Sequence, residues 1–582
     1  MKYQELTDAY AKIEATTKRL EMTDLLVELL KKTPKELLPK MMYLTQGKLY
    51  PDFQGVEIGI ADKLAIRAIS EGTGKKAEDV TTLFNKVGDL GQTAYEIKLK
   101  SAHKNSGITI EEVYKTLDEI AGISGAGTVS AKLKKLADLI FKASAGEAKY
   151  LIRTATGKLR LGVADMTMLD ALAIVFGGGK HTKEVLERAY NISSDLGTVA
   201  AAVAKGGLKG AEDFSVQVNR PIRPMLAERL SDPKEILEKM GGQTAVEFKY
   251  DGERLQVHKN GNEVELFSRR LEKTTHQYPD VIELVQKNVK AKSAIFEAEV
   301  VALNIETGEL LPFQELMHRR RKHGITQAVQ DYPIAMFCFD LLFVNGKDLT
   351  KSEYPVRRKK LEEIITLSDQ LKLGESIVTK DAQELEAFFE RAVAEGVEGV
   401  ICKSVAKDSF YKAGARGWAW IKYKRDYKSE MTDTVDLVVI GGLHGRGRRA
   451  GTYGALLLAS YDPKTDMFHS VTKCGSGFTD LDLAGFSKRL NPLKISHKHP
   501  RAESDMKADV WFIPGLVLEI IGAEITLSPI HKTAWEKVRK NAGLAIRFPR
   551  FTGKYRDDKA PEDATTDQEI LEMYEGRVHK IR

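Results

Sequence analysis

A short segment near the middle of the chain reads Thr244-Ala245-Val246-Glu247-Phe248-Lys249-Tyr250-Asp251-Gly252-Glu253-Arg254. Its first half is rich in apolar and aromatic residues and predicts a strand that ends near Phe248, and Asp251-Gly252 predicts a tight turn. Two more strands are expected, at 254–258 and 264–267, with the Asn260-Gly261 turn between them. Lys249 is therefore expected near the rim of a sheet.

The residues around Lys249 suit covalent chemistry on a phosphate. A lysine between two aromatic residues can be partly desolvated and placed near other cations, which lowers its pKa and makes its amine a nucleophile. Asp251 offers a carboxylate to a metal ion, Gly252 allows a phosphate close to the backbone, and Arg254 can bind an oxyanion. The other interpretation is a charged hairpin with exposed ends, and the short pattern alone does not decide between them.

Length and composition predict a soluble protein of several domains. The chain has 582 residues, of which 42% are hydrophobic and 29% charged. At about 100–200 residues per domain, about three to five domains are expected. The sequence has no apolar run of membrane-spanning length, and its first residues form no apolar signal segment. We therefore expect a cytoplasmic protein, or a nuclear one if the source is eukaryotic, with no membrane partner.

The cysteine and charge patterns indicate what kind of sites and partners the protein has. Cys338, Cys402 and Cys474 lie far apart and form no CxxC pair, so they predict core residues rather than a zinc site or a disulfide framework. The net charge is only +7, but basic residues cluster at 319–322, 357–360, 422–428 and 446–449. Such clusters are usually solvated surface; beside candidate phosphate chemistry, four of them favour a polyanionic partner.

Residues 1 to about 215 predict an all-helical segment, because apolar residues recur at helical spacing. Arg153, Lys158 and Arg160 precede a helix-like run at 166–176 and suit contacts with a phosphate backbone. The alternative interpretation of these three residues is an amphipathic helix pair with a solvated turn.

Two clusters of glycines occur near the end of this helical segment. Gly177-Gly178-Gly179-Lys180 lacks the first glycine and the Ser/Thr of a P-loop, and it predicts the end of a helix. Gly206, Gly207 and Gly210 predict a loose linker.

Residues 220 to about 428 alternate strands and helices, which predicts an α+β domain with antiparallel sheets. Alternation along a strand puts Glu297 and Glu299 on one face, and a buried carboxylate requires a cation or a metal. Glu398 and Lys403 lie toward opposite ends of a strand of small residues. Phe339 could stack on a purine, although core packing is the commoner fate of such an aromatic residue.

A second pair of charges follows in the strand at 418–424. Alternation places Lys422 and Lys424 on one face, together with Trp418 and Trp420. Residues 429–582 then read as short strands with glycine corners, which predicts an OB-type barrel, a common nucleic-acid platform. A basic turn between its first two strands contains Arg446, Arg448 and Arg449.

The order of these features resembles the successive motifs of the covalent nucleotidyltransferase superfamily. The pattern Lys-x-Asp-Gly-x-Arg at 249–254 resembles the nucleotidyl-lysine motif, and 547–559 resembles the last motif of that superfamily. With the helical segment added, the chain resembles the archaeal and eukaryotic ATP-dependent DNA ligases over nearly its whole length. The resemblance implies three domains: an all-α DNA-binding domain (1–215), an α+β adenylation domain with antiparallel sheets (216–428) and an all-β OB-fold domain (429–582).

The resemblance also implies a reaction. The Lys249 amine attacks the α-phosphorus of ATP, AMP passes to the 5′-phosphate of a DNA nick, and the 3′-hydroxyl displaces AMP. Mg²⁺ or Mn²⁺ is expected to assist. Such an enzyme acts in DNA replication, repair and recombination.

Roles for individual residues follow from the same resemblance. Glu247 and Phe339 are expected to read the adenine, Arg254 and Arg269 the sugar or the nick phosphate, Lys422 and Lys424 the α-phosphate, and Arg550 and Lys559 the leaving pyrophosphate. Glu299, Lys403 and Arg416 complete the expected nucleotide-binding set. The expected metal-binding acids are Glu299, Glu398 and Asp251, and the expected DNA contacts are Arg153, Lys158, Arg160, Arg446, Arg448 and Arg449.

Arg550 and Lys559 lie in a different domain from Lys249, so a hinge motion near 428–433 is expected between the first step and DNA binding. We expect a monomer, nicked duplex DNA as substrate and a sliding clamp as a partner. Residues 383–389 nearly match a clamp-binding box, but the paired aromatic residues come one position early, so we interpret them as an ordinary amphipathic helix.

Other members of the superfamily are alternatives. RNA ligases and capping guanylyltransferases share the core, but the long helical segment argues against both. A non-catalytic nucleic-acid-binding protein with a relic pocket is disfavoured because unpaired buried charges would destabilise it. NAD⁺ is an unfavourable donor because the chain lacks a four-cysteine zinc module and the nicotinamide-binding segment of that branch, whereas ADP and GTP stay open.

Overall fold

The computed structural model describes residues 1–101, 107–125, 127–303, 310–311, 313–319, 325–395, 397–424, 433–445, 451–522 and 524–579. The chain divides into two compact units. Unit 1 comprises Met1–Ala77 and Ala94–Arg425, and unit 2 comprises Glu78–Thr93 and Asp426–Arg582. Within the described residues, no helix is both long enough and apolar enough to cross a membrane.

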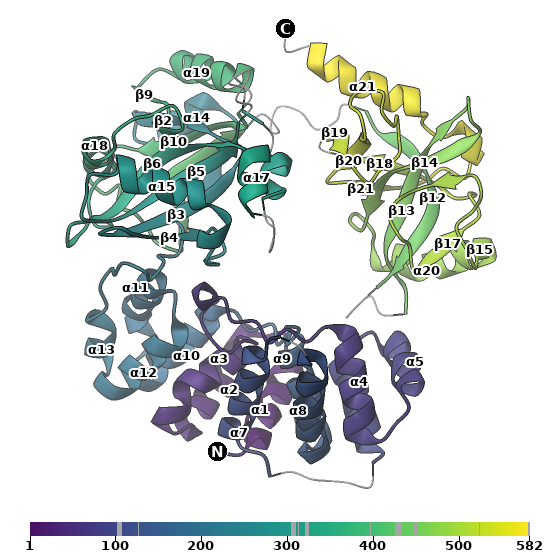
Figure 1. Cartoon of the computed structure of the whole chain (residues 1–582), viewed down its shortest axis with the longest axis horizontal. Helices are drawn as coiled ribbons and strands as arrows, with labels where there is room; N and C mark the ends of the chain where they lie inside the picture. Colours follow the sequence, from purple (N-terminus) through teal and green to yellow (C-terminus); the bar gives the residue numbers. More distant parts are fainter. Residues whose placement is uncertain are drawn as a thin grey trace. The chain divides into compact units, whose positions relative to one another are not determined.

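The first 212 residues form helices, as the apolar spacing predicts, and they are drawn in purple to blue in Figure 1. Leu26, Leu29 and Leu30 of α2 are buried, as are Leu136 and Ile140 of α8. The helices are α1 Tyr3–Glu14, α2 Arg19–Lys32, α3 Leu38–Thr45, α4 Asp62–Thr73, α5 Ala77–Val87, α6 Leu90–Leu99, α7 Ile110–Gly122, α8 Thr128–Lys142, α9 Ala145–Ala155, α10 Asp165–Phe176, α11 Lys183–Ser193, α12 Leu196–Gly206 and α13 Leu208–Glu212.

The predicted helix end at 177–180 is confirmed, but the predicted loose linker is wrong. Helix α10 ends at Phe176, and the backbone N–H of Gly177 still donates to the helix. Gly207 has a positive φ of 60° and turns the chain from α12 into α13. Gly210 packs so tightly that an added Cβ would lie 2.2 Å from the carbonyl oxygen of Ala202. Gly207 therefore provides a turn and Gly210 allows close helix packing, and neither marks a flexible linker.

Two sheets with mainly antiparallel pairing form the central part of unit 1. One has the strand order β1-β11-β10-β2-β9, and the other has β4-β3-β5-β6-β7 with β8 beside β6. Only the β1–β11 and β6–β8 pairs in these two sheets, among the residues that are described, are parallel. The strands are β1 Leu226–Arg229, β2 Thr244–Lys249, β3 Glu253–Asn260, β4 Glu263–Ser268, β5 Ser293–Ala302, β6 Ile334–Val344, β7 Lys347–Asp348, β8 Leu371–Leu373, β9 Ser376–Thr379, β10 Gly399–Ser404 and β11 Arg416–Lys424.

The predicted Asp251-Gly252 turn lies between β2 and β3. It joins strands of different sheets, because β2 belongs to the first sheet and β3 to the second. A Cβ on Gly252 would lie 2.2 Å from the carbonyl oxygen of Val300 in β5. The glycine is therefore required by the neighbouring strand, and Lys249 lies where the first sheet meets the second.

Helices cover the outer faces of both sheets (Figure 1). Helices α14 and α19 pack against the first sheet through a core that includes Ile236, Phe388 and Phe389. Helices α15 and α18 pack against the second sheet around Val285 and Leu361. The helices of this part are α14 Pro233–Lys239, α15 Pro279–Asn288, α16 Phe313–Met317, α17 Ile325–Asp331, α18 Tyr354–Ile364 and α19 Ala382–Ala394. Because Leu385 and the paired aromatic residues of α19 are buried, the amphipathic-helix interpretation of 383–389 is confirmed.

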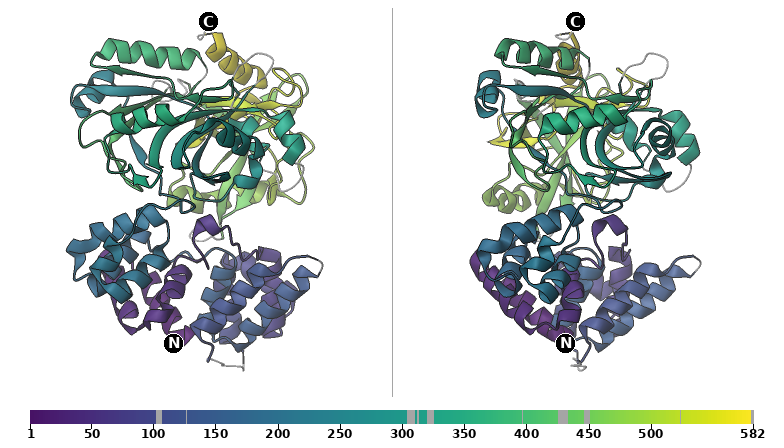
Figure 2. Two further views of the ribbon diagram at one scale, coloured as in Figure 1. Left: turned by 60° about the vertical axis from the view of Figure 1, so that its left-hand side comes forward. Right: turned by 90° about the vertical axis from the view of Figure 1, so that its left-hand side faces the viewer.

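Unit 2 is built mainly from strands, drawn in green to yellow in Figure 2. Strands β12, β13 and β14 run side by side (Figure 1). Its core contains Leu437, Leu456, Leu458, Phe512 and Leu518. The strands are β12 Val435–His444, β13 Tyr453–Asp462, β14 Met467–Cys474, β15 Lys494–Ile495, β16 Ala502–Glu503, β17 Val510–Phe512, β18 Val517–Ile521, β19 Glu524–Ser528, β20 Gly543–Arg547 and β21 Arg550–Tyr555. In the C-terminal part of unit 2, helices α20 Asp480–Leu490 and α21 Asp567–His579 accompany these strands, and the prediction of a strand-rich C-terminal part is confirmed.

Candidate active site

A cavity of about 640 Å³ lies at the meeting of the two sheets of unit 1. Its wall is formed by β2 and the turn after it, by the inner residues of β3 to β6, and by β10 and β11. Nearly all the charged residues that the sequence singles out in this part of the chain line it. They are Glu247, Lys249, Asp251, Arg254, Arg269, Glu299, Glu398, Lys403, Arg416, Lys422 and Lys424.

Lys249 ends β2 and projects into this cavity, with 24% of its side chain exposed. Its Nζ lies 2.5 Å from Oε2 of Glu398, and Lys424 pairs with the same oxygen. Sheet register explains the arrangement: β10 lies between β2 and β11, and Gly399 is opposite both Lys249 and Lys424. The amine is therefore neither in bulk solvent nor buried without a partner.

The three acids near Lys249 differ in their proton affinity. Burial would raise the pKa of Glu398, but the charges of Lys249 and Lys424 outweigh it and lower the pKa to about 2. Burial raises the pKa of Asp251 to about 6, with the neighbouring Glu398 adding to the effect. For Glu299, burial is again the largest cause; Lys249 and Arg254 oppose it, Glu398 and Asp251 reinforce it, and the pKa rises to about 7.

These acids do not form a complete metal site by themselves. No group of three potential ligand side chains converges for a metal ion anywhere in the described part of the chain. Glu299, Glu398 and Asp251 nevertheless line the same cavity, and their role as metal ligands stays a prediction. Their chemistry still fits Mg²⁺, which is usually held by one or two carboxylates together with water and substrate phosphates.

The wall formed by β11 is basic. Burial lowers the pKa of Lys422, and the nearby charges of Lys424, Arg229 and Arg416 lower it further. Arg269 and Arg270 add exposed guanidinium groups at the rim. Mutual repulsion among these cations is relieved when an anion binds between them, so this wall is suited to phosphate groups.

Arg254 has partners within the protein. Its guanidinium binds the buried Glu297 through Nε and Nη2, at 2.8 Å for the closest contact, and Nη1 donates to the carbonyl of Met225. The Tyr411 hydroxyl donates to the same carboxylate. Arg254 also lines the cavity. Its hydrogen bonds join β3 to β5, so it stabilises this wall in addition to any contact that it makes with substrate.

One end of the cavity combines aromatic and charged groups. Phe339 lines it, and the Nζ of Lys403 donates to the Phe339 carbonyl at 3.0 Å. Lys403 and Glu247 are almost completely buried and form an ion pair. A flat ring beside one acceptor and one donor is suited to a nucleobase.

The cavity is also lined by residues that had no assigned role in the nucleotide-binding set. Trp420 and Met225 line it, as do Ser268, Arg270 and Phe313. Arg270 has a sequence signal, since it follows Arg269 directly, and Trp420 is one of the residues expected beside Lys422. Phe313 is the first residue of α16, and no sequence pattern predicted that it would line the cavity.

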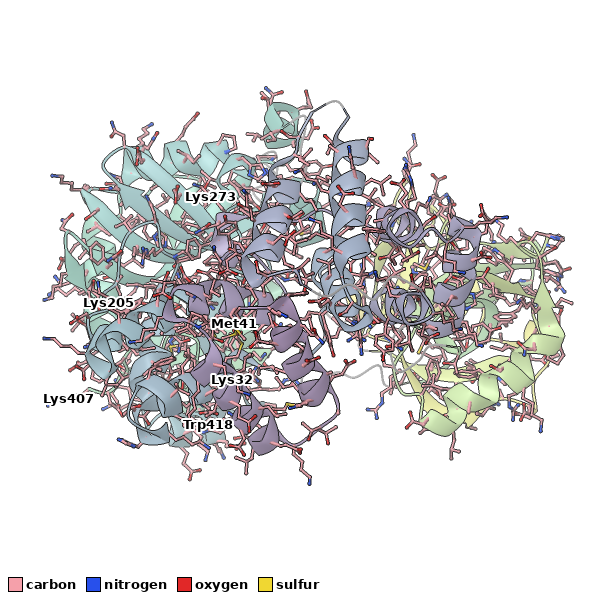
Figure 3. All side chains as sticks on the ribbon, turned by 90° about the horizontal axis from the view of Figure 1, so that it is seen from below. Lys32, Met41, Lys205, Lys273, Lys407 and Trp418 are labelled. Atoms are coloured by element: carbon pink, nitrogen blue, oxygen red, sulfur yellow. The ribbon has the colours of Figure 1, made fainter. Side chains whose placement is uncertain are left out.

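The expected pairing of the two tryptophans on one face is wrong. Trp420 lines the cavity, whereas Trp418, labelled in Figure 3, is 46% exposed, and Lys239 of α14 lies over its ring. The register between β1 and β11 is interrupted between Ala227 and Glu228, which are opposite Gly417 and Ile421. This irregularity breaks the simple alternation along β11.

The expected DNA contacts lie in different surroundings. Arg153 is largely buried and pairs with Glu14 at 2.9 Å. Lys158 pairs with Asp62 at 2.5 Å, and Arg160 is exposed with a positive φ of 52°. Arg446, Arg448 and Arg449, and the expected hinge at 428–433 except for its last residue, lie outside the described residues.

In unit 2, Arg550 is exposed at the start of β21. Lys559 instead pairs with Asp436 at 2.7 Å, and Arg556 pairs with the same carboxylate. Of the two residues expected to orient pyrophosphate, Arg550 is therefore exposed, whereas Lys559 is held by an ion pair within unit 2.

Comparisons with known proteins cover nearly the whole chain. Three family profiles match: the DNA ligase N terminus at residues 2–173, the ATP dependent DNA ligase domain at 224–424 and the ATP dependent DNA ligase C terminal region at 449–559. "DNA ligase 2" of Thermofilum pendens is 52% identical and aligns over 99% of this chain and 97% of its own. "DNA ligase" of Staphylothermus marinus is 51% identical over 100% of both chains. A solved structure titled "Pmar-Lig_PreS3" shares the fold, with a TM-score of 0.55, 18% identity and coverage of 95% and 99%.

Proposed function

The chain belongs to the ATP-dependent DNA ligases, which seal nicks in DNA through a lysyl-AMP intermediate, and we propose that Lys249 is the lysine that carries the AMP. The observation that supports this most strongly is the position of the Lys249 Nζ in a cavity with a basic wall on β11, beside Glu398. A lysine without a nucleotide-sized space and without cations for the phosphates could not perform the reaction.

Lys249 would act by nucleophilic attack. Its amine forms a P–N bond to the α-phosphorus of ATP, while the bond to pyrophosphate breaks. Attack requires that the contact between Lys249 and Glu398 opens and that the amine gives up a proton to water as the P–N bond forms. Lys422 and Lys424 would hold the α-phosphate and stabilise the negative charge that grows on its oxygens.

Other residues would fix the nucleotide around that phosphate. Phe339 would stack on the base, with Glu247 and Lys403 at its polar edge. Arg269 and Arg416 would contact the sugar or a nick phosphate. Glu299 and Glu398, with Asp251 nearby, would hold Mg²⁺; when bound, that ion supplies Lewis-acid stabilisation of charge on the phosphate.

We keep the division into domains at 1–215, 216–428 and 429–582, and we propose that Arg160 and the basic turn at 446–449 contact DNA. We also propose that the enzyme acts as a monomer with a sliding clamp as its partner. Size-exclusion chromatography of the ligase alone and mixed with a clamp tests both statements; coelution with the clamp and a monomer-sized peak without it are expected.

Nick sealing tests the substrate assignment. The protein is incubated with nicked DNA or nicked RNA duplexes, with ATP, ADP or GTP, and with Mg²⁺ or Mn²⁺, and the joined strand is measured on a denaturing gel. We expect joining of nicked DNA with ATP and a divalent cation. Preferential joining of nicked RNA would assign the site to an RNA ligase instead, and GTP use without ATP use would contradict the proposed base contacts.

A further inference from the structure

The Glu247 carboxylate is held by two side chains of α18 that do not line the cavity. The Tyr354 hydroxyl donates to Oε1 of Glu247 at 2.9 Å, and Nη1 of Arg358 donates to the same oxygen at 2.8 Å. Nη2 of Arg358 also donates to the carbonyl of Gly374 at 3.0 Å. In the sequence, Arg358 is only part of the basic cluster at 357–360 and Tyr354 belongs to no motif, so their contact with Glu247 is visible only in the fold.

Counting acceptors shows what these contacts leave for a ligand. A carboxylate oxygen can accept about two hydrogen bonds. Oε1 of Glu247 already accepts from Tyr354 and Arg358, whereas Oε2 pairs with Lys403. One acceptor position on Oε2 is therefore left, next to the Nζ of Lys403, and both residues line the cavity.

An acceptor beside a donor distinguishes the purines. Adenine presents an amino donor beside a ring-nitrogen acceptor, whereas guanine presents two acceptors, O6 and N7, on the corresponding edge. Adenine would pair with both Glu247 and Lys403. Guanine would set its O6 against a carboxylate oxygen, which is repulsive and leaves buried groups unpaired.

We propose that Tyr354 and Arg358 are positioning residues that set the preference for adenine over guanine nucleotides by fixing the orientation of the Glu247 carboxylate. This inference rests on the proposed function, because it requires Glu247 to face the base. Neither α18 side chain lines the cavity, so they act through Glu247.

The energetic reason lies in the pairing of Glu247 with Lys403. Loss of either α18 contact does not leave a buried charge without a partner, because Lys403 still neutralises the carboxylate. It does leave Oε1 with one hydrogen bond in place of two, so that the carboxylate is held less firmly and can turn both oxygens toward the ammonium. The acceptor and the donor would then satisfy each other, and the site would no longer favour adenine.

Nucleotide binding without chemistry tests the proposal. In the full-length chain with Lys249→Ala, the Kd values of ATP and GTP are measured by calorimetry, alone and with Tyr354→Phe, Arg358→Gln or Glu247→Gln. Glu362→Gln is the matched control, because it removes only the partner of Arg358 Nε, a half-exposed carboxylate. The preference for ATP is the Kd of GTP divided by the Kd of ATP. Each of the first three changes is expected to lower this ratio by about tenfold, and the control should leave the ratio unchanged. In the enzyme with Lys249 intact, KM for ATP should rise more than kcat falls.

The outcomes separate this inference from the proposed function. If Glu247→Gln lowers the ratio but Tyr354→Phe and Arg358→Gln do not, the positioning role is wrong and Glu247 alone reads the base. If Glu247→Gln leaves the ratio unchanged, the proposed base contact fails and the inference fails with it, while adenylation of Lys249 stands. Should Arg358→Gln unfold the protein, Tyr354→Phe decides, because it keeps the ring and removes one hydroxyl.

Discussion

At the scale of single residues, the cavity depends on carboxylates that each hold more than one cation. Glu398 pairs with Lys249 and Lys424, and Glu247 pairs with Lys403 and Arg358. Such pairs keep long side chains in one orientation before a nucleotide arrives, which lowers the reorganisation needed for reaction.

A comparable pair occurs in unit 2, where His469 is held between acids. Its Nδ1 lies 2.7 Å from Asp567 at the start of α21, and its Nε2 lies 3.4 Å from Glu503. Burial lowers the pKa of His469, but the hydrogen bond and charge of Asp567, with Glu503 and Asp462, outweigh it and raise the pKa above its usual value. The positive charge on His469 therefore helps to hold α21 against β14.

We predict that this contribution disappears at high pH. Because the folded-state pKa of His469 is raised, its stabilisation is complete below the unfolded-state pKa and is lost as pH rises through the folded-state value. His469→Gln should cost about 1.5–3 kcal/mol at about pH 6 and clearly less at about pH 9. Thermal unfolding at both pH values measures this, and His497→Gln, at an exposed site, should show no such difference. An equal loss for His469→Gln at both pH values would refute the ion pair.

At the scale of elements, local patterns predicted most helices and strands, but pairing between elements was not predictable from them. The alternation that gives β2, β3 and β4 is local, and so is the glycine run that ends α10. The switch of sheet at Asp251-Gly252 and the common partner of Lys249 and Lys424 depend on which distant strands become neighbours. Periodicity along a single strand contains no information about that choice.

Clustered glycines usually predict a flexible linker, but helix packing overrides that rule at the glycines around α12 and α13. Composition there suggests flexibility, yet Gly210 lies against the backbone of Ala202. Gly206, four residues earlier, has open space where a Cβ would lie.

Two alanine substitutions test this difference. Gly210→Ala should destabilise the protein by about 1–3 kcal/mol, because the new methyl group would overlap the Ala202 carbonyl. Gly206→Ala, the matched control near the end of α12, should be neutral or stabilise by about 0.5–1 kcal/mol. Thermal or urea unfolding provides both values. Equal effects of the two substitutions would mean that the segment is the loose linker that its composition suggests.

At the scale of the whole molecule, the order of the charged residues along the chain predicted the family and most of the cavity, because each of those residues has a chemical role. The partners that support them were not predictable. Tyr354 and Tyr411 belong to no motif and Arg358 only to a basic cluster. Their roles arise only where α18 meets Glu247 of β2 and where Tyr411 meets Glu297 of β5.

Arg550 allows a test of whether unit 2 takes part in enzyme adenylation. If it orients the leaving pyrophosphate, Arg550→Ala should slow enzyme adenylation by about 10²-fold, since removal of one preorganised charge contact typically costs about that much. Joining of a nick that already carries AMP should change by less than about threefold, because no pyrophosphate leaves in that step. Lys554→Ala, on the same strand and paired with Glu519, is the control. Equal losses in both steps would assign Arg550 to DNA binding instead.

The most direct test of the account is the fate of the α-phosphorus of ATP. The wild-type chain, Lys249→Ala and Lys239→Ala are incubated with ATP radiolabelled at that position and Mg²⁺, and then separated on a denaturing gel. Lys239 lies over Trp418 and does not line the cavity, so it controls for the loss of a lysine elsewhere in unit 1. We predict a labelled band for the wild type and Lys239→Ala, discharged by added pyrophosphate, and none for Lys249→Ala. A Lys249→Ala band of wild-type intensity would contradict the assignment of Lys249 as the nucleophile.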